Sequence, residues 1–152
     1  MTRVAIALGS NLGDRVAHLT LAAEGLHRLL SEFRLSTFHE TEPVGVSAQP
    51  RFLNAAAIGI TSLSAGELLQ QLLSLETAYG RERPYAGAPR TLDLDLILYG
   101  EDVIDEPGLH VPHPRFRDRA FVLEPLAEIA PDWRDPVTGM TVAELAGKRT
   151  TH

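Results

Sequence analysis

The 152-residue chain contains no cysteine. Disulfides, thiolate nucleophiles and cysteine-ligated zinc are therefore excluded, and a reducing, cytoplasmic compartment is favoured. No apolar run approaches the roughly 20 residues of a membrane span. The apolar start of the chain is too short for a signal peptide, because Asn11, Gly13 and Asp14 follow it at once, so it is interpreted as a first strand. We expect a single domain over residues 1–152, with a frayed tail at 148–152.

Lysine is almost absent: Lys148 is the only one among the 14 basic residues, and the rest are arginines. The formal net charge is −6, so a broad basic surface for nucleic acid is not expected. The scarcity of lysine also excludes a P-loop, and no Gly-x-Gly-x-x-Gly follows the first strand. A GC-rich genome alone can explain the arginine bias, but guanidinium groups also suit bidentate phosphate contacts, so the positions of the arginines matter.

Hydrophobic periodicity predicts the order strand, helix, strand, strand, helix, strand. The expected ranges are strands 4–8, 33–41, 52–62 and 90–100, and helices 14–30 and 64–80. This β-α-β-β-α-β order is typical of a ferredoxin-like α+β sandwich with a mainly antiparallel sheet. Both long helices should cover one face, with the first and third strands central and the last beside the first. Further elements are expected at 109–111 (strand), 121–130 (helix) and 142–147.

The predicted strand 90–100 holds two carboxylates in a distinctive arrangement. Period-two alternation puts Leu92, Leu94, Leu96 and Leu98 on one face and Asp93, Asp95, Ile97 and Tyr99 on the other. Residues i and i+2 of a strand lie about 6.5–7 Å apart and point the same way, so the aspartates repel unless a cation lies between them. Two divalent ions about 3.5–4 Å apart would fit, as in phosphoryl transfer. A half-exposed strand with a polar outer face is the ordinary alternative.

Arginines stand in connections on both sides of this strand. They are Arg81, Arg83 and Arg90 before it, and Arg115, Arg117 and Arg119 after it, the second group following His113 between two prolines. Cations brought to a metal-binding carboxylate strand would make a polyphosphate site, closed by the first loop. Solvated loop charges are the alternative, and a lone histidine is more often structural than functional.

Aromatic residues make up only 6% of the chain, so their positions are informative. Phe52 stands two residues before Asn54, and Phe121 two residues after Arg119. Two ring faces and an amide would hold a flat, polar heterocycle by stacking and edge hydrogen bonds. On the residue types alone, however, both phenylalanines are expected in the core.

Seven stretches together match a known family pattern in order and spacing. They are IALGSNLG at 6–13, TEPVG at 41–45, QPRFLNA at 49–55, GRER at 80–83, PRTLDLD at 89–95, VPHPR at 111–115 and RAF at 119–121. With them the chain resembles the 6-hydroxymethyl-7,8-dihydropterin pyrophosphokinase (HPPK) family over nearly its whole length. The resemblance implies the ferredoxin-like fold and transfer of pyrophosphate from ATP to the pterin hydroxymethyl group, with release of AMP, in folate biosynthesis.

The resemblance also implies a role for each matching residue. Two Mg²⁺ ions would be held by Asp93 and Asp95, with Arg81 and Arg90 acting as catalytic residues beside them. ATP would be contacted by Glu76, Arg81, Arg83, Arg90, Leu96, His110, His113 and Arg119. The pterin would be contacted by Thr41, Val44, Phe52, Asn54 and Phe121.

The chain departs from the family pattern in two places. The loop before Pro89 is shorter than the family pattern and lacks the Arg-Trp pair that relatives often carry, which leaves Tyr85 as a candidate for the aromatic cover. Leu73 stands where a glutamine often helps to hold ATP. The expected partners are small molecules only, with no nucleic acid, no membrane and a monomeric chain. Two other functions stay open: another magnesium-dependent phosphoryl or nucleotidyl transferase, and a non-catalytic small-molecule-binding module.

Overall fold

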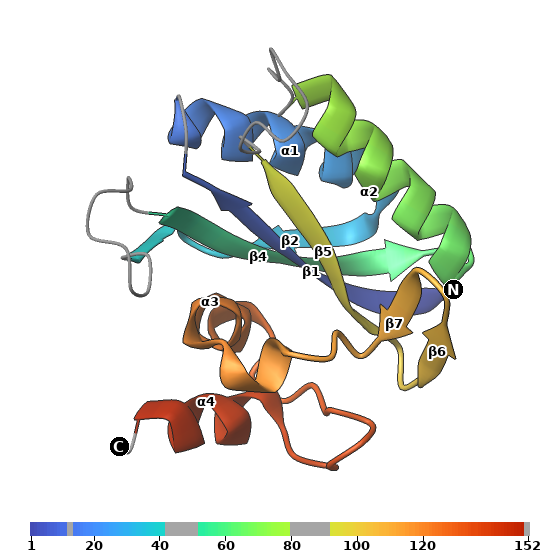
Figure 1. Cartoon of the computed structure of the whole chain (residues 1–152), viewed down its shortest axis with the longest axis vertical. Helices are drawn as coiled ribbons and strands as arrows, with labels where there is room; N and C mark the ends of the chain where they lie inside the picture. Colours follow the sequence, from blue (N-terminus) through green and yellow to red (C-terminus); the bar gives the residue numbers. More distant parts are fainter. Residues whose placement is uncertain (12–13, 42–51, 80–91, 151–152) are drawn as a thin grey trace.

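The computed structural model describes residues 1–11, 14–41, 52–79 and 92–150. A five-stranded sheet lies between two layers of helices (Figure 1). Its strands are β1 (Thr2–Ser10), β2 (Ser31–Leu35), β3 (His39–Thr41), β4 (Phe52–Thr61) and β5 (Asp93–Tyr99). One face is covered by α1 (Arg15–Leu29) and α2 (Ala65–Tyr79), and the other by α3 (Ala120–Ile129), on whose far side α4 (Val142–Thr150) packs. A hairpin of β6 (Ile104–Glu106) and β7 (Leu109–Val111) and the 3₁₀ turn η1 (Phe116–Asp118) complete the fold.

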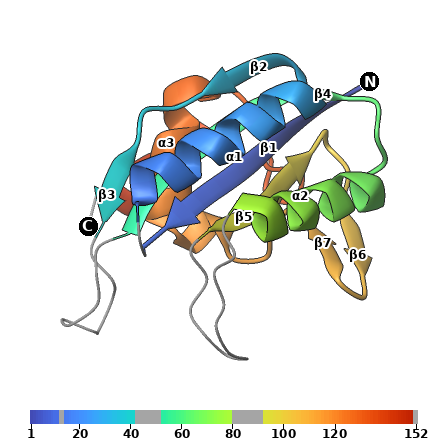
Figure 2. The same cartoon turned by 90° about the horizontal axis from the view of Figure 1, so that it is seen from above.

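The strand order β2-β4-β1-β5, with β3 also paired to β4, confirms the predicted ferredoxin-like topology. β1 is central and pairs antiparallel with β4 on one side and β5 on the other. The two long helices cross the same face of the sheet next to each other (Figure 2). The β-α-β-β-α-β unit alone places helices on only one face of the sheet. The C-terminal elements, which follow that unit in the chain, pack on the opposite face.

Both long helices begin where their capping residues predict. The Asp14 side chain accepts the backbone N–H of Ala17 at 3.0 Å, which satisfies an N–H group that has no partner within the helix. Ser64 and Glu67 form a reciprocal capping box, with bonds of 2.8 and 3.1 Å between each backbone N–H and the other side chain. The two helices therefore have defined starting points on the sheet.

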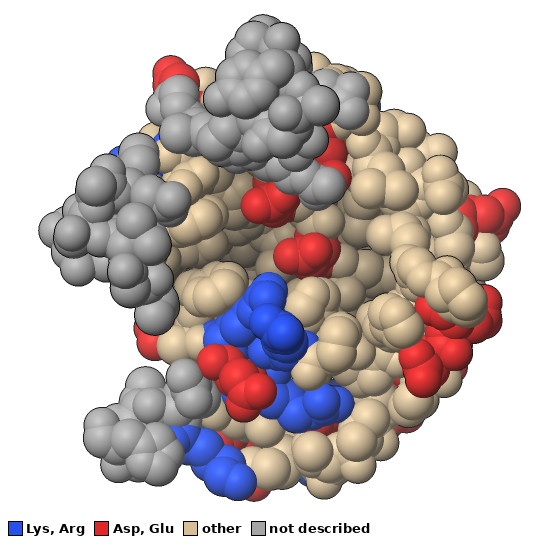
Figure 3. Space-filling view, viewed as in Figure 1, with Lys and Arg blue, Asp and Glu red and all other residues tan. Residues whose placement is uncertain are grey.

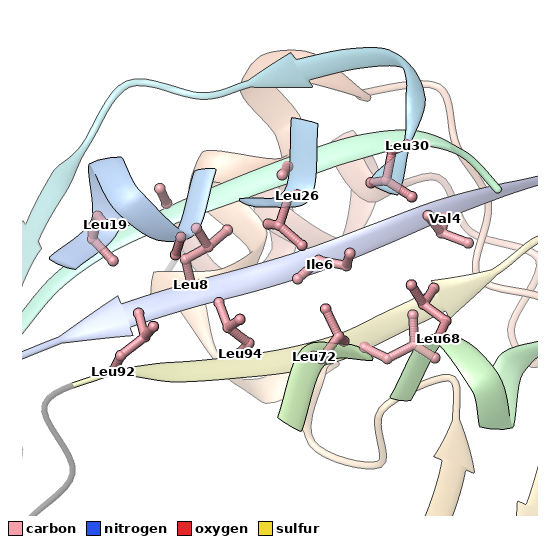
Figure 4. Packing of buried hydrophobic residues seen from close by; sticks show 14 of the residues in the cluster. Val4, Ile6, Leu8, Leu19, Leu26, Leu30, Leu68, Leu72, Leu92 and Leu94 are labelled. Atoms are coloured by element: carbon pink, nitrogen blue, oxygen red, sulfur yellow. The ribbon is translucent and has the colours of Figure 1, made fainter. Parts of the chain in front are cut away.

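The first core lies between the sheet and the two long helices. Leucines from α1 and α2 point toward the apolar side chains of β1 and β5 (Figure 4). Leu19, Leu26, Leu68 and Leu72 have no exposed surface, and burial of a leucine side chain stabilises a fold by about 1.5–3 kcal/mol. This core fixes the face of β5 that holds Leu92, Leu94 and Leu96, and so directs the intervening aspartates to the opposite face.

The second core lies between the sheet and the α3–α4 layer. On this face the central strands present small side chains, among them Ala5, Ala7 and Ala56. Small residues in a strand permit close approach of another layer, and α3 packs there through Val122, Leu123 and Leu126. The α3 layer contacts only part of this face, and the remaining part forms a cleft.

The predicted continuous strand 33–41 is wrong, because the chain forms two strands in that range. The interruption is at Ser36, whose backbone N–H donates to the Ala56 carbonyl and whose hydroxyl accepts the Ala56 N–H, both at 2.9 Å. The side chain thus replaces a backbone carbonyl in the ladder. As a result β3 is a separate three-residue strand at the edge of the cleft.

The predicted alternation of β5 is correct as far as Leu96 and wrong beyond it. Ala5 pairs with Leu98 and Ile6 with Leu96, so Ile97 is an extra residue in a β-bulge. The inserted residue reverses the alternation, because the side-chain period of a strand is two. Leu98 therefore packs with Ile97 in the second core, and Tyr99 packs against the first core instead.

The C-terminal third is more regular than predicted. Residues 101–108, for which no regular element was predicted, contain β6, which pairs with the predicted strand β7. Helix α3 is confirmed within one residue at each end. Helix α4 starts at a capping box of Thr141 and Glu144 and continues to Thr150. Of the helices in the described ranges, none combines the length and the apolar character that crossing a bilayer would require.

Candidate active-site cleft

A cleft of about 750 Å³ opens on the sheet face that α3 leaves uncovered. Figure 3 shows acidic and basic side chains meeting at a hollow on this side of the molecule. Its lining comes from the end of β1, the end of β3, the start of β4, the start of β5, the turn η1 with its flanking residues, and the start of α3. The lining residues are Ala7, Leu8, Gly9, Thr41, Phe52, Asn54, Asp93, Asp95, Arg115, Asp118, Arg119, Ala120, Phe121 and Val122.

The two aspartates of β5 line the cleft together. Asp93 and Asp95 are each partly exposed, while Leu92, Leu94 and Leu96 are at most 5% exposed on the opposite face. Edge strand β5 is further fixed by Glu76 of α2, whose carboxylate accepts the backbone N–H of Leu94 at 2.7 Å. Leu94, which stands between the aspartates, is therefore fixed twice: its side chain is buried in the first core, and its backbone N–H is bound by Glu76.

The facing wall comes from the segment 115–119. Its 3₁₀ turn has about three residues per turn, so Arg115 and Asp118 point to the same side and line the cleft with Arg119. The intervening Phe116 is fully buried in the second core. The cleft thus has the Asp93 and Asp95 carboxylates on one wall, and two guanidinium groups together with the Asp118 carboxylate on the other.

His113 is oriented by its surroundings. Its backbone N–H donates to the Ile97 carbonyl at 3.0 Å, and its Nδ1 accepts the Arg115 backbone N–H at 3.2 Å. Burial lowers the pKa of His113 below the ordinary value, with the Arg119 and Arg115 charges acting in the same direction and Asp95 opposing them. The ring is therefore neutral at pH 7, and with Nδ1 as acceptor its proton lies on Nε2.

The opposite end of the cleft has a fixed polar pair. Asn54, 4% exposed, donates from Nδ2 to Thr41 Oγ1 at 2.8 Å. This bond leaves Asn54 Oδ1 as an acceptor and the Thr41 hydroxyl proton as a donor. Gly9 lies directly opposite Asn54 in the register, and a Cβ at Gly9 would be 3.1 Å from Asn54 Oδ1. The glycine therefore keeps this acceptor accessible.

Two aromatic rings complete that end, and neither is in the core. Phe121 is 40% exposed, although it belongs to a helix whose neighbouring residues Val122 and Leu123 are buried. Phe52 is partly exposed at the start of β4. The Arg119 guanidinium carbon lies 5.5 Å from the Phe121 ring centroid, within cation–π range. The expectation from residue type, that both phenylalanines are core residues, is wrong.

The family resemblance implies a role in the site for a set of residues, and seven of them line the cleft together: Thr41, Phe52, Asn54, Asp93, Asp95, Arg119 and Phe121. Four others lie outside its lining, among them His113, whose contacts are described above. Glu76 contacts Leu94 as described, Leu96 is buried in the first core, and the His110 Nδ1 lies 2.7 Å from Asp105 Oδ1 across the β6–β7 hairpin. Arg81, Arg83, Arg90 and Val44 are outside the described residues, as is Tyr85.

Seven lining residues were not among the predicted site residues, and three of them bear on binding: Gly9, Arg115 and Asp118. Gly9 stands in the stretch IALGSNLG at 6–13, but no role in the site was assigned to it. Arg115 was noticed as one of three alternating arginines, but alternation does not distinguish which of them reach the site. The signal that could have separated them is the three-residue repeat of a 3₁₀ turn.

The carboxylates fit a magnesium site completed by substrate. Within the described ranges, no group of three or more His, Cys, Asp or Glu side chains is arranged to hold a metal ion. Mg²⁺ is usually bound by one or two carboxylates together with substrate phosphates and water, not by an all-protein cage. Two aspartates at i and i+2 on the wall of a cleft are the donor set that this coordination requires.

Together the fold and the cleft define a ferredoxin-like α+β protein with a small-molecule site on the sheet face opposite its two long helices. Residues 5–131 match the family model described as 7,8-dihydro-6-hydroxymethylpterin-pyrophosphokinase (HPPK). The chain therefore belongs to the HPPK family. Its relatives include the 2-amino-4-hydroxy-6-hydroxymethyldihydropteridine pyrophosphokinases of Pseudomonas aeruginosa and Bacillus subtilis.

The similarity to these relatives extends over most of both chains. The Pseudomonas aeruginosa protein is 44% identical over 137 residues, which is 88% of this chain and 84% of the relative. The Bacillus subtilis protein is 45% identical over 126 residues, or 82% and 75%. Among solved structures, wild-type Plasmodium falciparum HPPK-DHPS superposes with a TM-score of 0.79 over 97% of this chain, at 13% identity. That match supports the fold alone, and it spans only 44% of the longer Plasmodium chain.

Proposed function

We propose that this chain is an ATP-dependent diphosphotransferase that moves pyrophosphate from ATP to 6-hydroxymethyl-7,8-dihydropterin, yielding AMP and the pterin diphosphate. The main support is that one cleft holds a carboxylate pair, two arginines and two aromatic rings with an amide. An enzyme for another phosphoryl transfer would use the carboxylate pair and the arginines, but it would not need the two aromatic rings and the amide. A non-catalytic binder would leave the carboxylate pair without a role.

The triphosphate would lie between β5 and η1. Arg115 and Arg119 would bind its outer oxygens, since guanidinium groups suit planar, multidentate phosphate recognition. The Nε2–H of neutral His113 would donate to a phosphate oxygen. Such charge placed in advance stabilises a phosphoryl-transfer transition state, in which positioning contributes more than covalent chemistry by the protein.

Asp93 and Asp95 would hold the magnesium ions, for which a count of two follows from the family resemblance. When bound, the metal would neutralise phosphate charge and orient the reacting groups. The contribution of the chain is to keep both carboxylates on the same face of β5, fixed from behind by the leucines and by the Glu76 contact to Leu94. Repulsion between the paired carboxylates makes a bound cation favourable.

The pterin would lie at the Asn54 end, between the Phe52 and Phe121 rings. Asn54 Oδ1 would accept from an N–H on the pterin edge and the Thr41 hydroxyl would donate to a ring acceptor, which follows from the hydrogen bond between these two side chains. Phe121 exposes 40% of its surface in the protein alone, and stacking on a flat ring would cover it. The hydroxymethyl group would then point along the cleft toward the aspartates.

Several further expectations accompany this proposal. Arg81 and Arg90 would act on the phosphates, with Arg83 nearby, and Val44 would contact the pterin. Glu76, Leu96 and His110 would contribute to ATP binding at the β5–β7 side. We expect a monomeric, cytoplasmic enzyme with small-molecule partners only.

One assay tests the reaction against its rivals. The protein is incubated with ATP, Mg²⁺ and 6-hydroxymethyl-7,8-dihydropterin, and the nucleotide products are separated. AMP formed only when the pterin is present supports the proposal. ADP would indicate a different phosphoryl transferase, and pterin binding without nucleotide turnover would indicate a binding module.

A further inference from the structure

Arg117 differs from the two arginines that flank it, because it is directed away from the cleft. Its Nε and Nη2 donate to the two carboxylate oxygens of Asp135, the second bond being 2.8 Å long. Asp135 has no exposed surface. A fully buried carboxylate from the segment before α4 thus holds the middle residue of the turn η1.

Asp135 is itself held firmly and independently of Arg117. Its carboxylate also accepts the Val137 N–H at 3.0 Å and the Thr138 hydroxyl at 2.7 Å. Its backbone closes the same loop, donating to the Met140 carbonyl at 2.9 Å and accepting the Gly139 N–H at 2.8 Å. Burial raises the pKa of Asp135, but the hydrogen bonds from Arg117, Thr138 and Val137 together lower it to about 2, so the anchor is ionised at every pH at which the protein works.

The turn η1 needs such an anchor. It has only three residues and no side-chain cap at its start, and its backbone bonds are 3.1–3.3 Å long. A short 3₁₀ turn has poor hydrogen-bond geometry. Burial of Phe116 fixes the depth of the turn, but hydrophobic contact is not directional. A bidentate arginine–carboxylate contact is directional, so it can fix the rotation.

We propose that the Arg117–Asp135 pair positions the arginine wall: by fixing the rotation of η1 it aims Arg115 and Arg119 into the cleft. This inference rests on the proposed function, in which those two arginines bind the ATP phosphates. Buried ion pairs contribute little net stability compared with apolar replacements, which favours a role in geometry. Arg117 and Asp135 are positioning residues, since neither lines the cleft.

The test is the separation of two Michaelis constants. Arg117→Lys keeps the charge but loses the planar fork, and Asp135→Asn keeps the shape but loses the charge. The matched control is Arg134→Lys, because exposed Arg134 donates to the Gly139 carbonyl of the same loop at 2.7 Å without touching η1. We expect both test variants to raise the KM for ATP at least five-fold with the KM for pterin changed less than two-fold, and the control to change neither.

A merely structural role would give a different result. Partial unfolding lowers the amount of active enzyme, and so the apparent kcat, while both KM values stay constant. That outcome, or an equal rise of both KM values, would overturn the inference. Because both variants break one contact, the double variant R117K/D135N should raise the KM for ATP no further than the more severe single variant; additive rises would also count against it.

Failure of the proposed function would be visible separately. If the wild-type protein forms no AMP, the function is wrong, and the inference is then tested by calorimetric binding of Mg-ATP alone. R117K must still bind Mg-ATP at least five-fold more weakly than R134K. Equal affinities of the two variants would refute the anchoring role whatever reaction the protein catalyses.

Discussion

Replacing Phe121 with alanine should weaken pterin binding while leaving the fold nearly intact. The ring is 40% exposed and belongs to neither buried cluster. Truncation of a phenylalanine that is fully buried costs about 3–5 kcal/mol of stability, whereas substitutions outside the core usually stay within about 0.5 kcal/mol. For this half-buried ring we expect a loss of stability nearer the second value than the first.

The expected loss of affinity is larger. Stacking of a flat heterocyclic base on an aromatic side chain contributes about 1–3 kcal/mol, which corresponds to a roughly 5- to 150-fold change in Kd at about 1.4 kcal/mol per factor of ten. Arg119 also loses its ring partner at 5.5 Å. A cation–π contact at an exposed site contributes about 0.5–1 kcal/mol, so ATP affinity should fall by about five-fold or less.

The assay is steady-state kinetics at varied pterin and at varied ATP, with thermal unfolding measured in parallel. Leu21→Ala is the matched control, since Leu21 on α1 is 41% exposed and does not line the cleft. Phe121→Tyr should retain most pterin affinity, because it keeps the ring face, and Phe121→Leu should not. A Phe121→Ala variant with pterin KM within two-fold of wild type, or one equally impaired for both substrates, would refute the stacking role.

Other predictions follow from single contacts. Asp95→Asn should lower turnover more than a hundred-fold without lowering Tm, whereas Asp132→Asn, exposed and outside the cleft, should change neither; normal turnover would refute the metal assignment. Gly9→Val should raise the pterin KM, because even a Cβ would lie 3.1 Å from Asn54 Oδ1, while the KM for ATP stays constant. Asp135 has a pKa lowered to about 2 from 3.8, so its stabilisation is complete above pH 3.8 and is lost as pH falls toward 2. Acid titration of the unfolding free energy should therefore show the gap between wild type and Asp135→Asn shrinking by about 2 kcal/mol below pH 4.

The parts of the fold that depend on local rules were predictable. The caps at Asp14 and Ser64, the order of the elements and the outward direction of Asp93 and Asp95 follow from residue type and period alone. The gathering of Phe52, Asn54 and Phe121 was one of two alternatives that the residue types left open, and only the family pattern favoured it. Residue type alone put both rings in the core, because the exposure of Phe121 depends on how α3 packs on the small residues of β1 and β4.

The parts that failed depend on single irregularities in the backbone. Strict alternation assigned Leu98 and Tyr99 to the wrong faces, because one extra residue in β5 reverses the period. Alternation likewise treated the arginines after His113 as equivalent, although a 3₁₀ turn separates Arg117 from its neighbours. Residue types indicate neither the β-bulge in β5 nor the 3₁₀ turn η1, so their positions depend on tertiary packing.

The bulge at Ile97 has a consequence for how sequence segments can be exchanged between members of the family. Its carbonyl receives the backbone N–H of His113, so the arginine wall is attached to the aspartate strand by main-chain atoms at that point. A hydrogen bond between two main-chain groups does not depend on which side chains the two residues carry. We therefore expect residues 113–121 to be transplantable as a block between relatives, provided that the receiving chain keeps the extra residue and supplies its own partner for position 117. Chimeras made in this way would vary the cations around the substrate while the carboxylate platform stays constant.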